Sequence, residues 1–201
     1  MGMDHLIGIV GDGYALVAAD RNVAHSIMTV KHDEDKILAL DNGKLLGCVG
    51  ELGDTKNFSE FVKKNMALYA LRNGVKLSAH AAAHFIRGEV AWSIRNSPKM
   101  CNMVLAGYDE DAGPSLHHID YMGGMHKMNY GGHGYGSFFG NALMDRHYRP
   151  NMPLAEGVAL MKKVCDEINT RFLVGGCTFM LKIVDKDGVR IIDFPTDAMN
   201  Q

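Results

Sequence analysis

Hydrophobic residues follow two different periods along this chain, and the way these periods alternate constrains the fold more than any other feature. Short hydrophobic runs separated by turn residues predict strands over residues 6–10, 14–20, 27–30, 37–40 and 45–50. The sequence Asp41-Asn42-Gly43 between the last two runs is a strong hairpin signal. The N-terminal part of the chain is therefore expected to form antiparallel strands.

After these runs the period becomes helical. Hydrophobic residues recur every three or four positions over 58–69, which predicts a helix with Asp54 as its N-cap and Gly74 just past its end. A second helix is expected to begin after Ser78, as its N-cap, and to end before Pro98. Two consecutive helices are therefore expected to follow the strands.

The same alternation repeats in the second half of the chain. Runs of strands that alternate with pairs of helices predict an α+β fold, with two antiparallel sheets and helices on their outer faces. No linker or repeat divides the sequence, so a single domain over 1–201 is expected. The expected elements of this half are strands over 103–108 and 116–121, helices over 139–148 and 153–172, and strands over 178–184 and 189–192.

Charge and composition disfavour several classes of protein. The chain has 21 Lys and Arg against 23 Asp and Glu, a net charge of −2, which disfavours a nucleic-acid-binding protein. It has neither a run of about 18 apolar residues nor a basic leader followed by an apolar segment, so no membrane span and no signal peptide are expected. Its four cysteines form no CxxC pair, which disfavours a zinc site and favours reduced, buried thiols.

Two motifs suggest ligand binding, and both lack residues that would support it. The stretch GGHGYGSFFG matches neither the dinucleotide fingerprint nor a phosphate-binding loop, so a tight loop before a helix explains it better. His80 and His84 have a spacing that can hold a metal, but the glutamate of an HExxH motif and a third ligand are missing. We therefore expect no cofactor and no metal. A metal- or nucleotide-binding α+β module is an alternative that rests on these two motifs alone.

Asp20 and Lys36 form a candidate functional pair. Asp20 ends a buried hydrophobic run, and Lys36 closes the acidic segment HDEDK. A buried carboxylate beside a lysine can tune the pKa of that lysine and so serve a nucleophile. The same two residues can form a structural ion pair, and spacing alone favours that interpretation.

Several segments, taken in order, resemble the proteasome beta subunits, a family with the N-terminal-nucleophile hydrolase fold. The matching segments cover nearly the whole chain, and GELGDT, NMVLAGYDE and GGHGYG are most similar to the beta-4 (beta type-2) group. The resemblance implies a four-layer αββα sandwich of two antiparallel sheets. The matching segments are LIGIVGDGYALVAAD with Lys36 beyond it, CVGELGDTKNFSEFVKKN, LYALRNG, NMVLAGYDEDAGPSLHHIDYMG, the GHGYG loop and TFMLKIVDKDGV.

The resemblance also indicates where a catalytic residue would stand. In active members, a threonine exposed by propeptide removal is the nucleophile, and its own amine acts as the base. The resemblance places Asp4 at that position, while Asp20 and Lys36 match the accessory positions. The family's glycine-loop serine is replaced by Tyr135, and its aspartate after the last long helix falls near Phe172. The scaffold therefore lacks the nucleophile.

The resemblance implies a non-catalytic subunit with no catalytic residues, in which Asp20 and Lys36 are remnants. Its expected role is to complete a beta ring and wall the proteolytic chamber of the 20S proteasome core in ubiquitin-dependent protein degradation. Its expected partners are the other alpha and beta subunits of a hetero-oligomeric 28-subunit core. The expected localisation is the cytoplasm and the nucleus.

An alternative is a self-processed amidohydrolase of the same fold with an unrecognised nucleophile. No threonine in the chain follows a glycine, so a Gly-Thr junction for self-cleavage is missing. Three other junctions, Gly47-Cys48, Gly136-Ser137 and Gly176-Cys177, join a glycine to a possible nucleophile. None of them precedes the first strand–turn–strand of the chain, over residues 6–20, which should follow such a nucleophile, and this disfavours the alternative.

Overall fold

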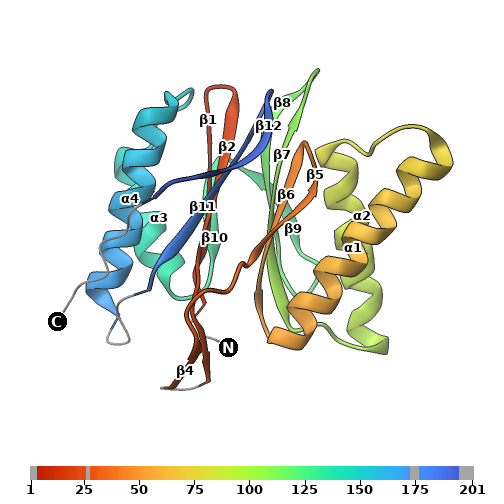
Figure 1. The fold of residues 1–201 in the computed structure, drawn as a ribbon, viewed down its shortest axis with the longest axis horizontal. Helices are drawn as coiled ribbons and strands as arrows, with labels where there is room; N and C mark the ends of the chain where they lie inside the picture. The colour runs from red at the N-terminus through yellow and green to blue at the C-terminus, as the bar shows by residue number, and fades with distance from the viewer. Residues whose placement is uncertain (1–3, 26–27, 173–176, 195–201) are drawn as a thin grey trace.

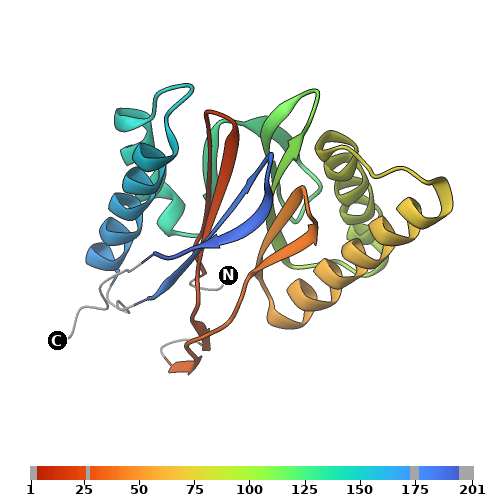
Figure 2. The ribbon, with the colours of Figure 1, turned by 45° about the horizontal axis from the view of Figure 1, so that its top comes forward.

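The computed structural model describes residues 4–25, 28–172 and 177–194 of the chain. The described elements form two five-stranded antiparallel sheets, a small two-stranded sheet and four helices. The two large sheets pack face to face, and the helices lie outside them (Figures 1 and 2). The expectation of an α+β fold with two antiparallel sheets and outer helices is confirmed.

The first large sheet has the order β10-β1-β2-β11-β12, and every neighbouring pair is antiparallel. Its central strand reads YALVAAD, and every residue of this strand is buried, because the second sheet packs on one face and a helix on the other. The strands are β10 (Tyr130–His133), β1 (Leu6–Gly11), β2 (Tyr14–Asp20), β11 (Phe179–Asp185) and β12 (Gly188–Ile192).

The second large sheet has the order β5-β6-β7-β8-β9 and is also antiparallel. The predicted hairpin turn joins its first two strands, and the Gly43 amide donates to Asp41 Oδ1 at 2.8 Å within that turn. The strands are β5 (Ile37–Asp41), β6 (Lys44–Gly50), β7 (Cys101–Asp109), β8 (Gly113–Ile119) and β9 (Met125–Met128).

A separate two-stranded sheet follows β2. It consists of β3 (Val23–His25) and β4 (Met28–Lys31), and its pairing shifts register between Val23 and Ala24. The strand predicted over 27–30 corresponds to β4, but Ile27 lies outside the described residues. β3 was not predicted, because three residues are too few to show a period.

The four helices form the two outer layers (Figure 1). α1 (Leu52–Asn73) and α2 (Ala79–Asn96) cover the second sheet, while α3 (Gly136–His147) and α4 (Leu154–Arg171) cover the first. The order of layers is therefore helix, sheet, sheet, helix. Among the described residues, none of the helices is both long and apolar enough to span a membrane.

The predicted helix ends are partly right. Ser78 is the N-cap of α2, and its side chain accepts from the Ala81 amide at 3.2 Å. Gly74 ends α1 in the left-handed conformation, with a φ of 69°. The prediction that Asp54 caps α1 is wrong, because the helix begins at Leu52 and Glu51 is its N-cap. Asp54 lies in the first turn and instead accepts the Met100 amide at 2.9 Å.

The glycine-rich stretch contains two strands that the sequence did not predict, β9 and β10. β10 lies against β1 so closely that a Cβ atom on Gly132 would stand 1.9 Å from the Leu6 carbonyl oxygen. A Cβ atom on Gly134 would meet the Asp4 carbonyl oxygen at the same distance. The glycines are therefore needed for close backbone approach, and this use of glycine hides the strand period.

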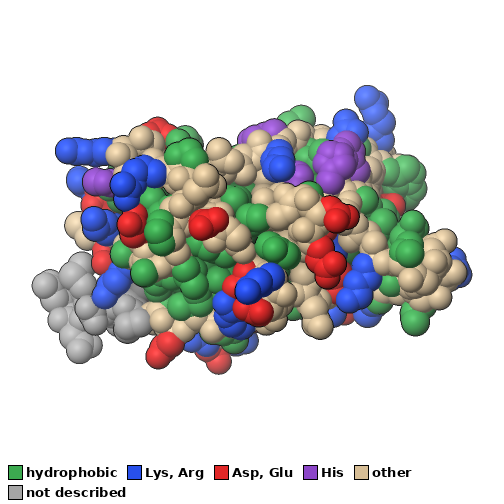
Figure 3. Space-filling model, turned by 90° about the horizontal axis from the view of Figure 1, so that it is seen from above, with side chains coloured by type: hydrophobic (Ala, Val, Ile, Leu, Met, Phe, Trp, Pro, Cys, Tyr) green, Lys and Arg blue, Asp and Glu red, His purple; other side chains and the backbone are tan. Residues whose placement is uncertain are grey.

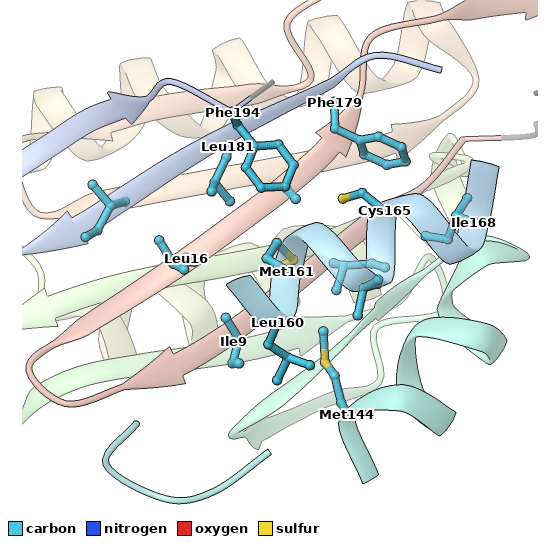
Figure 4. Close-up of a cluster of buried hydrophobic side chains, with 14 of the residues drawn as sticks. Ile9, Leu16, Met144, Leu160, Met161, Cys165, Ile168, Phe179, Leu181 and Phe194 are labelled. Atoms are coloured by element: carbon cyan, nitrogen blue, oxygen red, sulfur yellow. The ribbon is translucent and has the colours of Figure 1, made fainter. Parts of the chain in front are cut away.

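Three hydrophobic clusters hold the layers together, one between the two sheets and one between each sheet and its helices. Figure 4 shows the cluster beneath α4, where Met161, Cys165 and Ile168 point toward strands of the first sheet. Leu16 of β2 and Leu181 of β11 are fully buried opposite them. This packing fixes the position of the first sheet. The candidate site lies at the end of this sheet where β1 begins and β2 ends.

Candidate functional site

The Lys36 ammonium group is the centre of a buried cluster of charges. Its Nζ lies 2.6 Å from Asp4 Oδ1 and 2.7 Å from Asp20 Oδ2. It also donates to the backbone carbonyl of Asn22 at 2.7 Å. A lysine has three N–H donors, so every donor of Lys36 has an acceptor.

Strand pairing brings the members of this cluster together from distant parts of the sequence. β1 and β2 are antiparallel, so the residues before β1 meet the end of β2. There the His5 amide donates to Asp20 Oδ1 at 2.7 Å, and the Asp20 amide donates to the His5 carbonyl at 3.1 Å. Lys36 directly precedes β5 of the second sheet, and its carbonyl accepts the Cys48 amide of β6 at 3.0 Å. The cluster therefore joins the two sheets.

Asp4 is held at both of its carboxylate oxygens. One oxygen bonds Lys36, and the other accepts the amide of Gly50, at the end of β6, at 3.3 Å. The Asp4 side chain is 19% exposed, whereas those of Lys36 and Asp20 are 8% and 2% exposed. Asp4 is therefore the part of the cluster that solvent reaches.

The electrostatic environment keeps Lys36 protonated. Burial by itself lowers the pKa of Lys36, but the negative charges of Asp20 and Asp4 outweigh burial, and the pKa is raised. Burial raises the pKa of the Asp20 carboxyl, and Lys36 and the His5 amide offset only part of this rise. A lysine that stays charged and uses all of its donors cannot take a proton from a nucleophile.

His5 and Phe172 close the other side of the cluster. His5 is buried, and its Nδ1 accepts the Gly136 amide at 3.2 Å. Burial, followed by the charge of Lys36, lowers the pKa of His5 to about 4, so the ring is neutral at neutral pH. The ring centroid of Phe172 lies 4.8 Å from that of His5. Tyr135, which precedes α3, is half exposed.

Cys177 also lies beside the cluster, which sequence reasoning missed. Asn22 Nδ2 donates to its Sγ at 3.3 Å. Burial first, and the Asp20 charge second, raise the pKa of the Cys177 thiol to about 11. Its position follows from the register between β11 and β2, which pairs Phe179 with Asp20. Knowledge of that register would have placed Cys177 beside the cluster, but the sequence does not specify the register.

A cavity of about 630 Å³ opens beside the cluster. It lies between β5, β6 and the first turns of α1, and Asp4, Lys36 and Cys48 contribute to its wall. A second cavity, of about 20 Å³, borders Asp20 and Cys177. The larger cavity therefore brings solvent to the exposed edge of Asp4.

The histidine pair on α2 lies far from this cluster in the fold. The His80 and His84 rings contact each other with centroids 4.5 Å apart, and the His80 ring lies 6.1 Å from that of His117. His118 follows His117 on β8 and therefore points to the opposite face of the strand, where its ring lies 3.7 Å from that of His133. Among the described residues, no group of three or more His, Cys, Asp or Glu side chains could hold a metal ion.

Comparison with known proteins agrees with this geometry. Residues 4–184 match the family model described as proteasome subunit. The chain is 48% identical over 188 residues to proteasome subunit beta type-2-B of Arabidopsis thaliana, covering 94% of each chain. It is 46% identical to proteasome subunit beta type-2 of Dictyostelium discoideum, over 96% of this chain and 98% of that one.

The chain is also similar to a yeast subunit that carries the name beta type-4. The chain is 37% identical to proteasome subunit beta type-4 of Saccharomyces cerevisiae, over 95% of this chain and 98% of that one. The resemblance stated from the sequence is thus confirmed, and it extends over almost the full length of each relative. The chain belongs to the proteasome subunit family and is a proteasome beta subunit of the beta type-2 kind.

Proposed function

We propose that this chain is a non-catalytic beta subunit at the beta-4 position of the 20S proteasome core. It forms one domain over 1–201 with the N-terminal-nucleophile hydrolase fold. It completes the beta ring and walls the proteolytic chamber, and it acts in ubiquitin-dependent protein degradation in the cytoplasm and the nucleus. Its partners are the other alpha and beta subunits.

The bond between Asp4 and Lys36 is the observation that carries this proposal. A carboxylate at position 4 has no proton to give up and is a poor nucleophile compared with a threonine activated by its own amine. It instead neutralises Lys36 together with Asp20, at 2.6 Å and 2.7 Å. The accessory residues of an active subunit are thereby converted into a closed ion cluster that links the two sheets.

Exposed hydrophobic side chains on opposite outer layers support a role in assembly. On α1, the following turn and α2, Leu71, Val75 and Trp92 are 84%, 58% and 66% exposed. At the start of α3, in the opposite layer, Phe138 and Tyr135 are 73% and 50% exposed. Figure 3 shows exposed hydrophobic side chains in several separate areas of one face. Such surfaces are typical of a subunit with several neighbours.

Two measurements test the proposal. A tagged chain in cell lysate is expected to migrate with a complex of several hundred kilodaltons, and a dominant monomer near 22.1 kDa would contradict the assembly role. Peptide hydrolysis per assembled particle is expected to be unchanged by Lys36→Met. Lys182→Met, which removes another buried lysine, is the matched control. Loss of one peptidase activity with Lys36→Met alone, at equal particle abundance, would indicate catalysis.

The self-processed amidohydrolase remains the alternative, and the position of Cys177 is its best support. A cut before Cys177 would place a new amine and a thiol beside Asn22 and Asp20. However, the pKa of about 11 leaves the thiol protonated at neutral pH. Intact mass and N-terminal sequencing of the purified chain decide between the two functions. We expect one uncut chain, apart from ordinary loss of the initiator methionine.

A further inference from the structure

Cys48 and Cys101 lie on neighbouring strands and face the same side of the second sheet. In the register of β6 and β7, Cys48 is opposite Met103 and Cys101 is opposite Gly50. The two cysteines are therefore diagonal neighbours, and both belong to the hydrophobic cluster between this sheet and its helices. Because Gly50 has no side chain, the Cys48 thiol is the nearest same-face group on β6 for Cys101.

The two thiols interact directly. A hydrogen bond between them lowers the pKa of the Cys101 thiol and raises that of Cys48. Once the first proton leaves, the remaining proton lies between the two sulfur atoms and stabilises the thiolate. The nucleophilic form of a cysteine is its thiolate, so the pair is more reactive than two separate buried thiols.

The pair is also accessible from one side. Cys48 is 5% exposed and forms part of the wall of the cavity of about 630 Å³, whereas Cys101 is fully buried behind it. The bond to Cys101, burial and the charge of Asp4 raise the pKa of Cys48, and Lys56, on the same cavity wall, opposes only part of this rise. Cys165 differs from this pair, since it is fully buried beneath α4 in the other outer layer.

We propose that Cys48 and Cys101 form a dithiol oxidation site, at which a peroxide that enters the cavity produces an intramolecular disulfide. The thiolate attacks one peroxide oxygen, the O–O bond breaks, and a sulfenic acid and hydroxide form. The second thiol then attacks the sulfenic sulfur, the S–OH bond breaks, and water leaves. Two thiols lose two electrons in total, and one peroxide is reduced to two waters once the hydroxide takes up the remaining proton.

The new bond would tighten the sheet next to the charge cluster. A disulfide has an S–S distance of about 2.05 Å, so the diagonal side chains of Cys48 and Cys101 must turn toward each other at the shared end of β6 and β7. That end carries Gly50, whose amide bonds Asp4. Oxidation therefore links the redox state of the cavity to the position of Asp4. This inference does not depend on whether the chain is catalytic.

The test uses the native assembly purified with all thiols reduced, exposed to a small excess of hydrogen peroxide, then alkylated and digested without reductant. Mass spectrometry is expected to find a peptide pair linked through Cys48 and Cys101, with both thiols lost at the same rate. Cys165 is expected to stay alkylated as a free thiol. Independent oxidation of Cys48 with Cys101 still free, or no reaction at either residue, would overturn the proposal.

Two variants sharpen this test. With Cys101→Ser, Cys48 has no partner, so we expect its oxidation to continue to sulfinic acid. With Cys48→Ser, the buried Cys101 is expected to lose at least tenfold in its rate of oxidation, because the sulfur that faces the cavity is gone. Cys165→Ser is the control and leaves disulfide formation unchanged. Equal oxidation of Cys101 with and without Cys48 would contradict the proposed pair.

Discussion

Two buried lysines, Lys36 and Lys182, connect the segment just before β5 to the first sheet, but their partners differ. Lys36 reaches Asp4 and Asp20 in the first sheet, and the Asp20 side chain is 2% exposed. Lys182 of β11 reaches Asp35 at 2.5 Å, and the Asp35 side chain is 47% exposed. The two lysine side chains are almost equally buried, since Lys36 is 8% exposed and Lys182 is 9% exposed. The difference lies in how far water can reach each carboxylate.

Because of this difference, two ion pairs that look alike in the structure are expected to contribute differently to stability. When one partner is removed, the cost depends on the charge left behind, because an exposed carboxylate regains water and a buried one does not. Lys182 also donates to the Ile37 carbonyl, so both lysines donate hydrogen bonds to a backbone carbonyl as well as to a carboxylate. We therefore expect matched substitutions at the two sites to differ in size.

Lys36→Met is expected to have the largest effect. It leaves Asp20 buried without its cation and should lower the free energy of unfolding by about 3–5 kcal/mol. Urea-induced unfolding followed by Trp92 fluorescence measures this loss. Adding Asp20→Asn and Asp4→Asn removes the stranded charges, so the triple variant should recover at least half of it. A loss no larger than that of Lys182→Met would show that water reaches Asp20 after all.

The sequence predicted the large elements and missed those with the least hydrophobic signal. Helices α2 and α4 and the hairpin β5–β6 follow from periodicity and turn residues, and the structure confirms them. β10 was missed because its glycines serve close contact with β1, and β9 because its four residues, Met125–Met128, are too few to show a clear period. The N-cap of α1 was misplaced because Asp54 was assigned to the helix end, whereas its carboxylate bonds the Met100 amide. Tertiary contact, which a single sequence does not display, decided the cases of β10 and of this N-cap.

The candidate site was predictable only in part. The resemblance singled out Asp4, Asp20 and Lys36, and the structure brings the three together. The Gly50 amide and Cys177 were not foreseen, because their places depend on how β6 and β11 are registered against their neighbours. A hydrophobic pattern fixes which face of a strand is buried, but leaves open which residue of a distant strand lies opposite.

The buried His117 extends the comparison to a polar side chain without a hydrogen-bond partner among the described residues. We expect its effect on the free energy of unfolding to be the second largest. Neither of its ring nitrogens has a hydrogen-bond partner among the described residues. Burial, followed by the charges of His80, Lys127 and His84, lowers its pKa from 6.5 to about 4, against a smaller opposing effect of Asp109. Stability from the neutral ring is therefore complete above pH 6.5 and decreases as the pH falls toward 4.

The corresponding prediction concerns acid sensitivity. Between pH 7 and pH 5, protonation of His117 in the unfolded chain should cost about 2 kcal/mol of stability. His117→Phe removes this titration while keeping a ring of similar shape, so the decrease in the free energy of unfolding should shrink by that amount. Urea unfolding of both proteins at the two pH values measures it. An unchanged decrease would mean that His117 is protonated in the folded protein.

Lys182→Met should have a smaller effect, of about 1 kcal/mol or less in the free energy of unfolding. The half-exposed Asp35 is rehydrated, and its other oxygen already accepts the Ile37 amide at 3.0 Å. The same urea unfolding experiment measures the change beside Lys36→Met. A loss as large as that expected for Lys36→Met would show that exposure of the carboxylate does not set the cost.

The smallest effect is expected for a substitution that supplies the missing nucleophile, because we expect it to restore no catalytic activity. Suppose Asp4→Thr is produced with that threonine as the first residue, by cleavage of an N-terminal fusion. Threonine alone is a weak nucleophile and needs a positioned base and donors around the developing oxyanion. Asp20 and Lys36 would remain, now free of Asp4. The resemblance implies, however, that Phe172 stands near the place of the carboxylate that would orient the amine, and that Tyr135 replaces a small hydroxyl of active relatives.

Position matters as much as identity here, since a shift of about 1 Å can reduce a rate by about a hundredfold. The Asp4 carboxylate is now fixed by Lys36 and by the Gly50 amide, and a threonine keeps at most a part of that support. We therefore expect a threonine-directed probe to label no more sites in particles with this variant than in unmodified particles, as counted by mass spectrometry. Stoichiometric labelling at position 4 would show that the site lacks only its nucleophile. In that case the ion cluster around Lys36 would be an active site held inactive by Asp4 alone.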